Sequence, residues 1–251
     1  MTPPPRPRVP KDRCYWHGCE EAATTDDHVP PRVFFFEGTD IDGEDLKKNR
    51  FTVRSCVEHN QTFSDDEEYV AVIAYMALEN DPAAHRHALE RQFDTLRKKV
   101  NEQLGRRIGA SFQVSGATVM TPMGPGSALR VELPAIRRVG EKIARGLHYR
   151  LTGERLQGEV RVWAPNFAGG TPEVRTSLRN IGRSLDMVPF ATGVSGHPLV
   201  FEYAHFRDPM ARYVSMKFRF FRGFELRALA LSPWRTIFDD LPVSWPPADS
   251  P

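Results

Sequence analysis

The sequence predicts an α+β protein that begins with a metal-bound hairpin and helix, continues through helices, and ends in a mixed α/β region with an antiparallel meander. Three observations support this prediction. All three cysteines lie within the first 56 residues. Apolar residues recur at helical spacing through the middle of the chain. Strict alternation of apolar and polar residues, typical of a half-buried strand, appears at 214–220.

The composition fits a folded protein. Of 251 residues, 40% are hydrophobic and 10% aromatic, which is enough for a hydrophobic core. The net charge of +2 neither requires nor excludes a nucleic-acid partner. Neither an apolar run of about 20 residues nor an apolar signal core is visible, so we expect a cytoplasmic protein without a membrane partner. Three cysteines cannot all pair within one chain, which favours metal ligation over disulfides.

The chain divides into five predicted segments. Proline-rich ends indicate flexible tails, and the change from metal-ligand spacing to helical spacing marks the first internal boundary. The segments are a flexible tail (1–12), a zinc module (13–69), a helical connector (70–108), an α/β domain whose role the sequence leaves open (109–240) and a second flexible tail (241–251).

Two short strands are expected in the zinc module. Thr24 to Val29 should form the first strand, which ends at Pro30-Pro31 because proline cannot donate to a ladder. The polar, glycine-containing stretch 37–48 is expected to be a loop. Phe51 to Val53 should form the second strand, which leads into Cys56.

Helices are expected in three later regions. A nearly all-round apolar helix should follow Asp65, and we interpret its acidic first turn, Asp65 to Glu67, as favourable to the helix dipole rather than as metal-binding. Asp81 to Leu104 has amphipathic spacing and a basic outer face, which is either solvated or lies along a phosphate backbone. Pro134 to Gly153 and the stretch after Thr171-Pro172 predict two further helices.

The remaining segments are expected to be strands. Residues 109–133 indicate a hairpin that includes Phe112 and is interrupted by 123–126. Leu199 to Phe206, 214–220 and Phe224 to Leu231 predict the antiparallel meander.

Four residues have the spacing of a structural zinc site: Cys14 and Cys19 upstream, and Cys56 and His59 downstream. Thiolate and imidazole groups are the donors that suit tetrahedral Zn²⁺. His17 is an alternative ligand, since Cys14-x2-His17 is also ligand spacing. We favour Cys19, because three thiolates and His59 complete the four ligands.

Between these ligands lies the reactive tripeptide Asp26-Asp27-His28. Phosphodiester hydrolysis needs a base that activates water and a divalent cation that stabilises the developing charge. His28 can be that base at neutral pH, and Asp27 and Asn60 offer hard oxygens for Mg²⁺ or Mn²⁺. Adjacent strand residues point to opposite faces, so Asp27 and His28 share one site only if the backbone bends there.

The ordered combination Cys14-x4-Cys19, Asp27-His28-Val29-Pro30-Pro31 and Cys56-x2-His59-Asn60 resembles the HNH nucleases of the ββα-metal superfamily. The closest form is the zinc-ribbon subset with an Asp-His first motif and an Asn third motif. The resemblance covers residues 14–69 and implies a metal-dependent endonuclease whose expected substrate is DNA. It also implies that His28 is the general base, that Asp27 and Asn60 hold one catalytic Mg²⁺ or Mn²⁺, and that the two cysteine knuckles hold a structural zinc.

The sequence also departs from that family. Its members usually have cysteine where His59 stands, and the middle asparagine that orients the base is best matched by Asn49, at a loose spacing. Arg32 is a candidate phosphate ligand. The alternative hypothesis is a zinc-stabilised module without catalysis that binds nucleic acid or protein. In that case His28 would be a hydrogen-bonded hairpin residue and Asn60 a helix cap.

Overall fold

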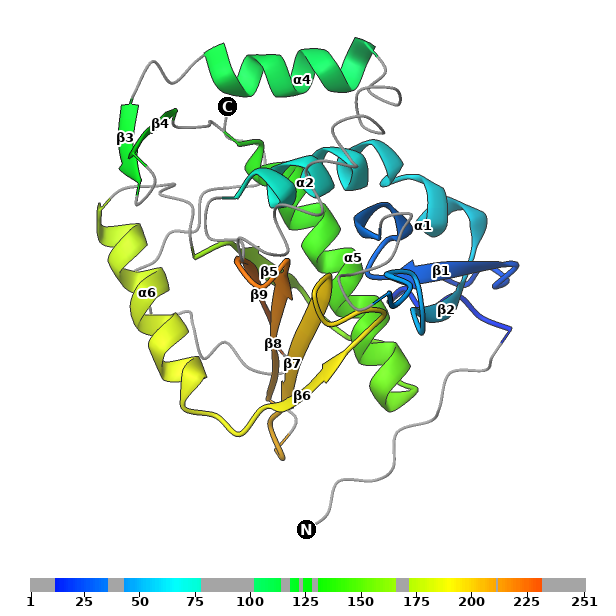
Figure 1. Ribbon diagram of the computed structural model, residues 1–251. Coiled ribbons are helices and arrows are strands. Elements are labelled where there is room, and N and C mark those ends of the chain that lie inside the picture. Colours follow the sequence, from blue (N-terminus) through cyan, green and yellow to red (C-terminus); the bar gives the residue numbers. More distant parts are fainter. Residues whose placement is uncertain are drawn as a thin grey trace.

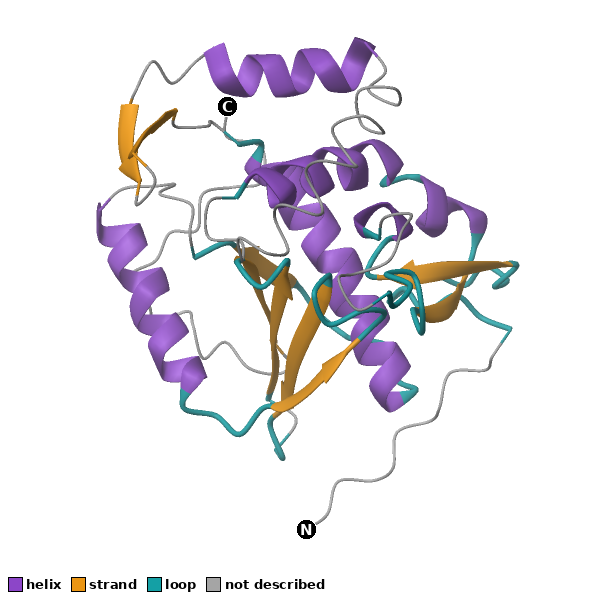
Figure 2. Cartoon of the chain, viewed as in Figure 1, coloured by secondary structure: helices purple, strands orange, loops and turns teal. Residues whose placement is uncertain are grey.

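The computed structural model describes residues 12–35, 43–77, 102–113, 118–121, 124–127, 131–165, 172–210 and 212–231, and its architecture is α+β with antiparallel sheets (Figures 1 and 2). This confirms the predicted α+β class with its antiparallel strands. Apart from Asp12, the predicted tails 1–12 and 241–251 lie outside the described residues. None of the described helices is long and apolar enough to cross a membrane.

A hairpin and a short helix form the N-terminal part. Strand β1 (Thr25–Val29) pairs antiparallel with β2 (Phe51–Ser55), and α1 (Val57–Gln61) follows almost at once. Strand β1 ends at the two prolines as predicted, and the 3-10 helix η1 (Arg32–Phe34) comes after them. The two predicted strands are therefore confirmed, and the second extends two residues further than expected.

Helix α2 (Ser64–Met76) confirms the predicted buried helix, because Tyr69–Tyr75 are all buried. Most of the predicted amphipathic helix with the basic face falls on 78–101, outside the described residues. Helix α4 (Glu102–Gln113) is followed by a hairpin of β3 (Thr118–Thr121) and β4 (Gly124–Ser127).

The prediction of a hairpin from residue 109 was therefore wrong at its start, because Phe112 lies in α4 and β3 begins at Thr118. Contacts made by α4 explain the longer helix. Arg107 forms ion pairs with Asp66 and Glu132. Ser111 shares a hydrogen bond of 3.2 Å with the Tyr69 hydroxyl. Tertiary contacts of this kind override the weak local preference for a strand.

Helix α5 (Leu133–Thr152) crosses the centre of the molecule, with the β1–β2 hairpin on one side and the larger sheet on the other (Figure 1). As predicted, Pro134 lies in its first turn and Gly153 ends it in the left-handed conformation, at φ 72°. Two glycines allow close approach. Gly140 lies against Val162 of the sheet, and an added Cβ at Gly146 would lie 2.6 Å from Val29 of β1.

The larger sheet has five antiparallel strands in the order β5-β9-β8-β7-β6. The predicted meander is confirmed as β7 (Phe201–Arg207), β8 (Tyr213–Phe220) and β9 (Phe224–Leu231). The edge strands β5 (Val160–Trp163) and β6 (Ala191–Val194) were not predicted, since four residues carry little periodic signal. Helix α6 (Pro172–Asp186) joins β5 to β6, and its Gly182 carbonyl accepts a hydrogen bond from Arg227 of β9.

One hydrophobic core runs from the N-terminal hairpin into the larger sheet. Phe34 stacks on Phe220 with ring centroids 4.6 Å apart. Ser195, just after β6, holds both strands of the hairpin, because its Oγ accepts from Phe51 N–H and donates to the Val29 carbonyl. The hairpin is thus fixed against the body of the protein at its prolyl end.

Candidate functional site

The four predicted zinc ligands come together. Their ligand atoms, on Cys14, Cys19, Cys56 and His59, all lie within 4.8 Å of one another. The Cys19 and Cys56 Sγ atoms are 3.9 Å apart, close to the tetrahedron edge of about 3.8 Å that a Zn–S bond of about 2.3 Å requires. This Cys/His cluster could hold a metal such as zinc. His17 is exposed and does not belong to it, which supports the preference for Cys19.

Local structure explains how the ligands meet. Cys56 is the N-cap of α1, and its Sγ accepts the His59 N–H at 3.4 Å. A spacing of three residues on a helix places both side chains on one face. In the other knuckle, Gly18 adopts φ 77°, and the Cys19 N–H donates to the Trp16 carbonyl at 3.2 Å. The tight turn therefore depends on a residue that tolerates positive φ.

The knuckle is also tied to the end of α5. Arg155, shortly after that helix, donates to the Cys14 carbonyl at 2.9 Å and to the Cys19 carbonyl at 2.8 Å. Trp16 stacks on the His59 ring, with centroids 4.8 Å apart. These contacts fix the two halves of the cluster, which are separated in sequence by the whole hairpin.

The protonation of the Cys/His cluster is linked to metal binding. Burial and the neighbouring thiols raise the pKa of Cys19 to about 11, against a hydrogen bond from the Glu21 backbone that lowers it. A bound metal ion reverses this effect, because a coordinating thiol is deprotonated. Burial lowers the pKa of His59, and neutral imidazole is the form that binds metal. The donor set therefore fits zinc.

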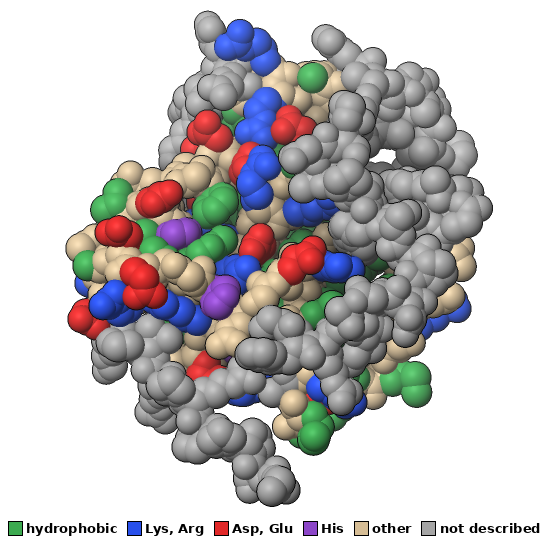
Figure 3. Space-filling model, turned by 180° about the vertical axis from the view of Figure 1, so that it is seen from behind, with side chains coloured by type: hydrophobic (Ala, Val, Ile, Leu, Met, Phe, Trp, Pro, Cys, Tyr) green, Lys and Arg blue, Asp and Glu red, His purple; other side chains and the backbone are tan. Residues whose placement is uncertain are grey.

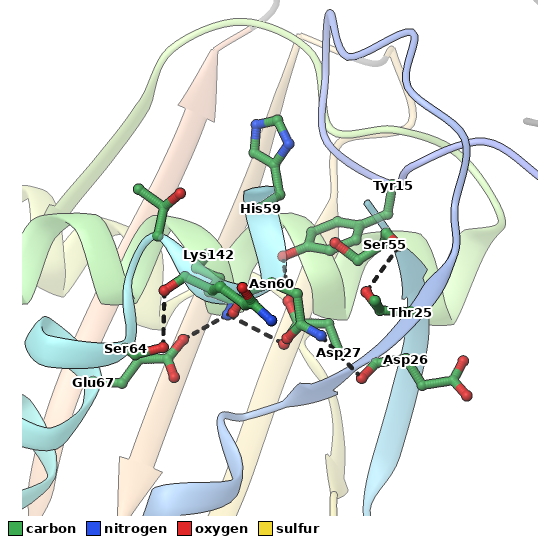
Figure 4. Close-up of polar contacts among 12 residues, drawn as sticks. Tyr15, Thr25, Asp26, Asp27, Ser55, His59, Asn60, Ser64, Glu67 and Lys142 are labelled. Atoms are coloured by element: carbon green, nitrogen blue, oxygen red, sulfur yellow. Dashed lines mark hydrogen bonds and ion pairs between the residues drawn. The ribbon is translucent and has the colours of Figure 1, made fainter. Parts of the chain in front are cut away.

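A second buried centre lies on the other side of α1 and contains a lysine (Figure 4). Lys142 of α5 is 2% exposed and Asp27 is 3% exposed. The Lys142 Nζ lies 3.1 Å from Asp27 Oδ1 and 2.5 Å from Glu67 Oε1, and it donates to the Asn60 carbonyl at 3.1 Å. An ammonium has three donors, so each of them has an oxygen partner. We call these four residues the ammonium site.

Burial shifts the acids of the ammonium site. It raises the pKa of Asp27 to about 6, although Lys142 and the Tyr15 hydroxyl, which donates to Asp27 at 2.9 Å, act in the opposite direction. The pKa of Glu67 is also raised, again chiefly by burial and against the influence of Lys142. Both carboxylates therefore depend on a nearby positive charge to remain ionised.

Asp27 and Asn60 both contact the Lys142 ammonium, which lies between them. Asn60 faces that ammonium with its main-chain carbonyl, while its side-chain amide donates to the Asp26 carbonyl at 3.4 Å. Sequence reasoning missed Lys142 and set Glu67 aside. The available signal was a lysine on the apolar stripe of α5, three residues after Val139.

His28 faces away from the ammonium site. The alternation of β1 buries Asp27 and leaves His28 half-buried on the opposite face, with Asp26. Burial lowers the pKa of His28, and Arg50 and Arg32 lower it further, while Asp26 acts in the opposite direction. The imidazole is therefore neutral at neutral pH, and two guanidinium groups lie within electrostatic range of it.

The other candidates have different surroundings. Asn49 is exposed at φ 59°, and its carbonyl accepts from Gly196 N–H. In the described part of the chain its side chain makes no hydrogen bond to His28. Arg50 was not predicted from the sequence. Its guanidinium lies 5.6 Å from the centroid of the Phe35 ring, and its Nη1 atom is buried without a hydrogen-bond partner among the described residues.

Comparisons with known proteins give no further assignment. No protein-family model matches the chain, and neither a curated protein nor a solved structure gives a significant match. On the face shown in Figure 3, acidic and basic side chains of the described residues are interspersed.

Proposed function

We propose that this chain is a metal-dependent endonuclease that hydrolyses nucleic-acid phosphodiester bonds, with DNA as the expected substrate. The observation that carries the proposal is the half-buried His28, whose pKa is lowered and which lies within electrostatic range of Arg32 and Arg50. A neutral imidazole can accept a proton from water, and guanidinium groups bind phosphate oxygens. These are two of the tasks that attack on a phosphodiester requires, and a divalent cation would supply the third by stabilising the developing charge.

In this proposal His28 accepts the proton of the attacking water. Arg32 and Arg50 hold the phosphate beside it, which adds Arg50 to the residues expected from the sequence. The Cys/His cluster keeps β1 and α1 together, so that His28 stays on a fixed strand. A rigid scaffold of this kind matters, because small displacements of a catalytic group lower the rate strongly.

The proposed Mg²⁺ or Mn²⁺ would be held by Asp27 and Asn60, whose oxygens suit a hard cation. When bound, it would stabilise the charge that develops on the phosphate and the leaving oxygen. Because Asp27 and His28 lie on opposite faces of β1, this step requires β1 to bend so that both residues face one phosphate. In the structure the oxygens at this position are Asp27 Oδ1 and the Asn60 main-chain carbonyl, and both contact the Lys142 ammonium. The donor set fits the cation, provided that the ammonium moves.

The experiment is a cleavage assay on a panel of single- and double-stranded DNA and RNA, with added Mg²⁺ or Mn²⁺. His28→Ala should reduce cleavage by at least about a hundredfold, as expected for loss of a general base, while nucleic-acid binding and the melting temperature stay near those of the parent protein. His17→Ala, the same substitution at an exposed histidine of the same module, is the matched control and should cleave normally. Equal cleavage by His28→Ala and the parent protein would reject the assignment.

A second candidate function is a zinc-stabilised binding module without catalysis. It is favoured by the ammonium site, where Lys142 already compensates the Asp27 charge from within the protein. A binding module would retain nucleic-acid or protein affinity without added Mg²⁺ or Mn²⁺ and would not depend on His28. Gel-shift assays with and without these ions, run beside the cleavage assay, separate the two functions.

A further inference from the structure

Three oxygen atoms from three separate elements converge on one point of the ammonium site. They belong to Asp27 of β1, the Asn60 carbonyl of α1 and Glu67 of α2, and the atom at their centre is the Lys142 Nζ (Figure 4). Two carboxylates and a carbonyl are the ligands that Mg²⁺ and Mn²⁺ prefer. The protein therefore places a cation, its own ammonium, among oxygens suited to a divalent metal.

The ammonium and a metal ion cannot both use these oxygens. Mg²⁺ binds oxygen at about 2.1 Å. The Nζ atom lies only 2.5 to 3.1 Å from each of the three oxygens, so an ion bound to the same oxygens would overlap it. Two positive charges so close together would also repel strongly in a buried setting.

The charges and the geometry of the lysine allow an exchange. The two carboxylates carry two negative charges, which the ammonium compensates by half and a divalent ion would compensate in full. Lys142 reaches the site on a flexible four-carbon stem, so its ammonium can move while α5 stays in place. The Nζ atom also lies 5.8 Å from the centroid of the Phe63 ring, whose face offers a cation a favourable contact.

We propose that the Lys142 ammonium and a divalent cation are alternative occupants of one position, and that Glu67 joins Asp27 as a ligand of the divalent cation. This inference rests on the proposed function and deepens it, since it names a third oxygen ligand and the group that the metal displaces. Lys142 then sets the metal concentration at which the site loads, because each ion that binds must first displace the ammonium.

The test measures Mn²⁺ binding to the zinc-loaded protein without nucleic acid, by electron paramagnetic resonance of the free ion. Lys142→Met removes the ammonium and keeps most of the side-chain volume. It should bind Mn²⁺ at least about tenfold more tightly than the parent protein, since charge and ligand count set the affinity of such sites. Lys48→Met, the same change at an exposed lysine, is the matched control and should leave Mn²⁺ affinity unchanged.

Glu67 is tested separately in a protein that keeps its lysine. Glu67→Gln should weaken Mn²⁺ binding by about tenfold or more, whereas Glu68→Gln, at the next position, should not. This pair keeps the inference testable if Lys142→Met does not fold. Equal Mn²⁺ affinity of Lys142→Met and the parent protein would overturn the exchange, and equal affinity of Glu67→Gln and the parent protein would overturn the role of Glu67.

The outcomes also separate this inference from the proposed function. If Mn²⁺ binding responds to Lys142 and Glu67 as expected but no nucleic acid is cleaved, the exchange stands and the nuclease proposal fails. If cleavage depends on Mn²⁺ and His28 while Lys142→Met leaves Mn²⁺ affinity unchanged, the nuclease proposal stands and the exchange fails.

Discussion

The Cys/His cluster and the ammonium site share one helix but balance their charges in different ways. The cluster combines three buried cysteines with an imidazole and has no cationic side chain among its four ligands. The ammonium site combines two carboxylates with a buried lysine that contacts both. The first centre could take a metal ion from outside the chain, whereas the second already contains a cation of its own. The kind of ligand agrees with this difference, because soft thiolates select zinc and hard oxygens accept an ammonium or Mg²⁺.

Helix α1 connects the two centres. His59 belongs to the cluster, and the carbonyl of the next residue, Asn60, accepts from Lys142. A change in one centre can therefore reach the other through a single turn of helix. Substitutions that damage one centre at a time test how far the two centres are independent.

The largest expected effect is the loss of the Cys/His cluster. Cys56→Ser removes a ligand but keeps a residue that can cap α1, so the loss of the metal ion alone should release the fixed arrangement of the hairpin and α1. Structural zinc contributes about 10–16 kcal/mol of apparent binding free energy in zinc-finger peptides, which exceeds the stability of most domains. Elemental analysis should find one zinc per parent chain and none in Cys56→Ser, and circular dichroism should show loss of structure.

His17→Ala is the matched control for this prediction, and it should keep its zinc because His17 is exposed and outside the cluster. Well-folded parent protein without zinc would disprove the zinc assignment. Loss of zinc from His17→Ala together with its retention in His59→Ala would exchange the roles of the two histidines.

Damage to the ammonium site should lower the free energy of unfolding by less than loss of the Cys/His cluster does. Asp27→Asn leaves the buried Lys142 with one carboxylate in place of two, and breaking a buried ion pair typically costs about 3–5 kcal/mol. Asp26→Asn is the matched control at the neighbouring position. It removes only a pair with Arg54 whose side chains are 61% and 45% exposed, and such pairs contribute about 0–1 kcal/mol. Urea unfolding of the zinc-loaded proteins measures both changes.

The two centres are independent if Asp27→Asn keeps its full zinc content while losing this stability. Loss of zinc from Asp27→Asn would show instead that α1 transmits the damage to the Cys/His cluster. An effect of Asp27→Asn no larger than that of Asp26→Asn would contradict the buried ion pair itself.

The two centres also differ in how far the sequence predicted them. The Cys/His cluster was predictable, because its ligands come in two local pairs, Cys14 with Cys19 and Cys56 with His59, and the spacing within each pair reports metal binding. The ammonium site depends on Lys142, which is 75 residues beyond Glu67 in sequence and joins it only through the packing of α5 on α2. No local pattern connects these residues.

The same distinction holds for the fold. Helix α5 was predicted from its apolar spacing together with Pro134 and Gly153, and the meander strands from their alternation. The edge strand β6, at Ala191–Val194, has no buried residues, so its sequence has no apolar alternation to report. The extension of α4 through Phe112 depends on contacts with other elements, which a local pattern does not contain.

A third buried polar group, the pair of His148 on α5 and His205 on β7, extends the comparison. His148 Nδ1 lies 3.1 Å from His205 Nε2 of β7, and both residues are buried. Burial, and then Arg207, lower the pKa of His205 from 6.5 to about 4. The unfolded chain therefore binds this proton at a higher pH than the folded protein does. Stability should be lost as the pH falls from 6.5 to about 4, by at most about 3 kcal/mol.

The effect is isolated by subtracting the unfolding free energy of a His205→Gln variant from that of the parent protein at each pH. Gln keeps a hydrogen-bonding group but does not titrate in this range, so the parent protein should lose more stability than the variant between pH 6.5 and 4. Zinc release at acid pH affects both proteins and cancels in the difference. Parallel pH dependences of the two proteins would show that His205 titrates normally in the folded protein.

The smallest expected effect concerns the contact that serves both centres. Gly146 of α5 packs on Val29 of the hairpin and, at 3.7 Å, on the ring of Tyr15, which lies in the cysteine knuckle and donates to Asp27. The Cβ of Gly146→Ala would lie 2.6 Å from a methyl group of Val29, and overpacking of this kind costs about 1–3 kcal/mol. Alanine also favours the helix by up to about 1 kcal/mol over glycine, so the net destabilisation should be about 1 kcal/mol.

Gly109→Ala in α4 is the matched control, because an added Cβ there meets nothing within 4 Å and only the helix preference remains. The two variants should therefore shift the urea midpoint in opposite directions, Gly146→Ala downward and Gly109→Ala upward. If Gly146→Ala is also stabilising, then Val29 yields to the new methyl group and the close approach of α5 to β1 is not needed. If Gly146→Ala lowers stability and also weakens zinc retention, the Cys/His cluster depends on the same packing that brings Lys142 to Asp27.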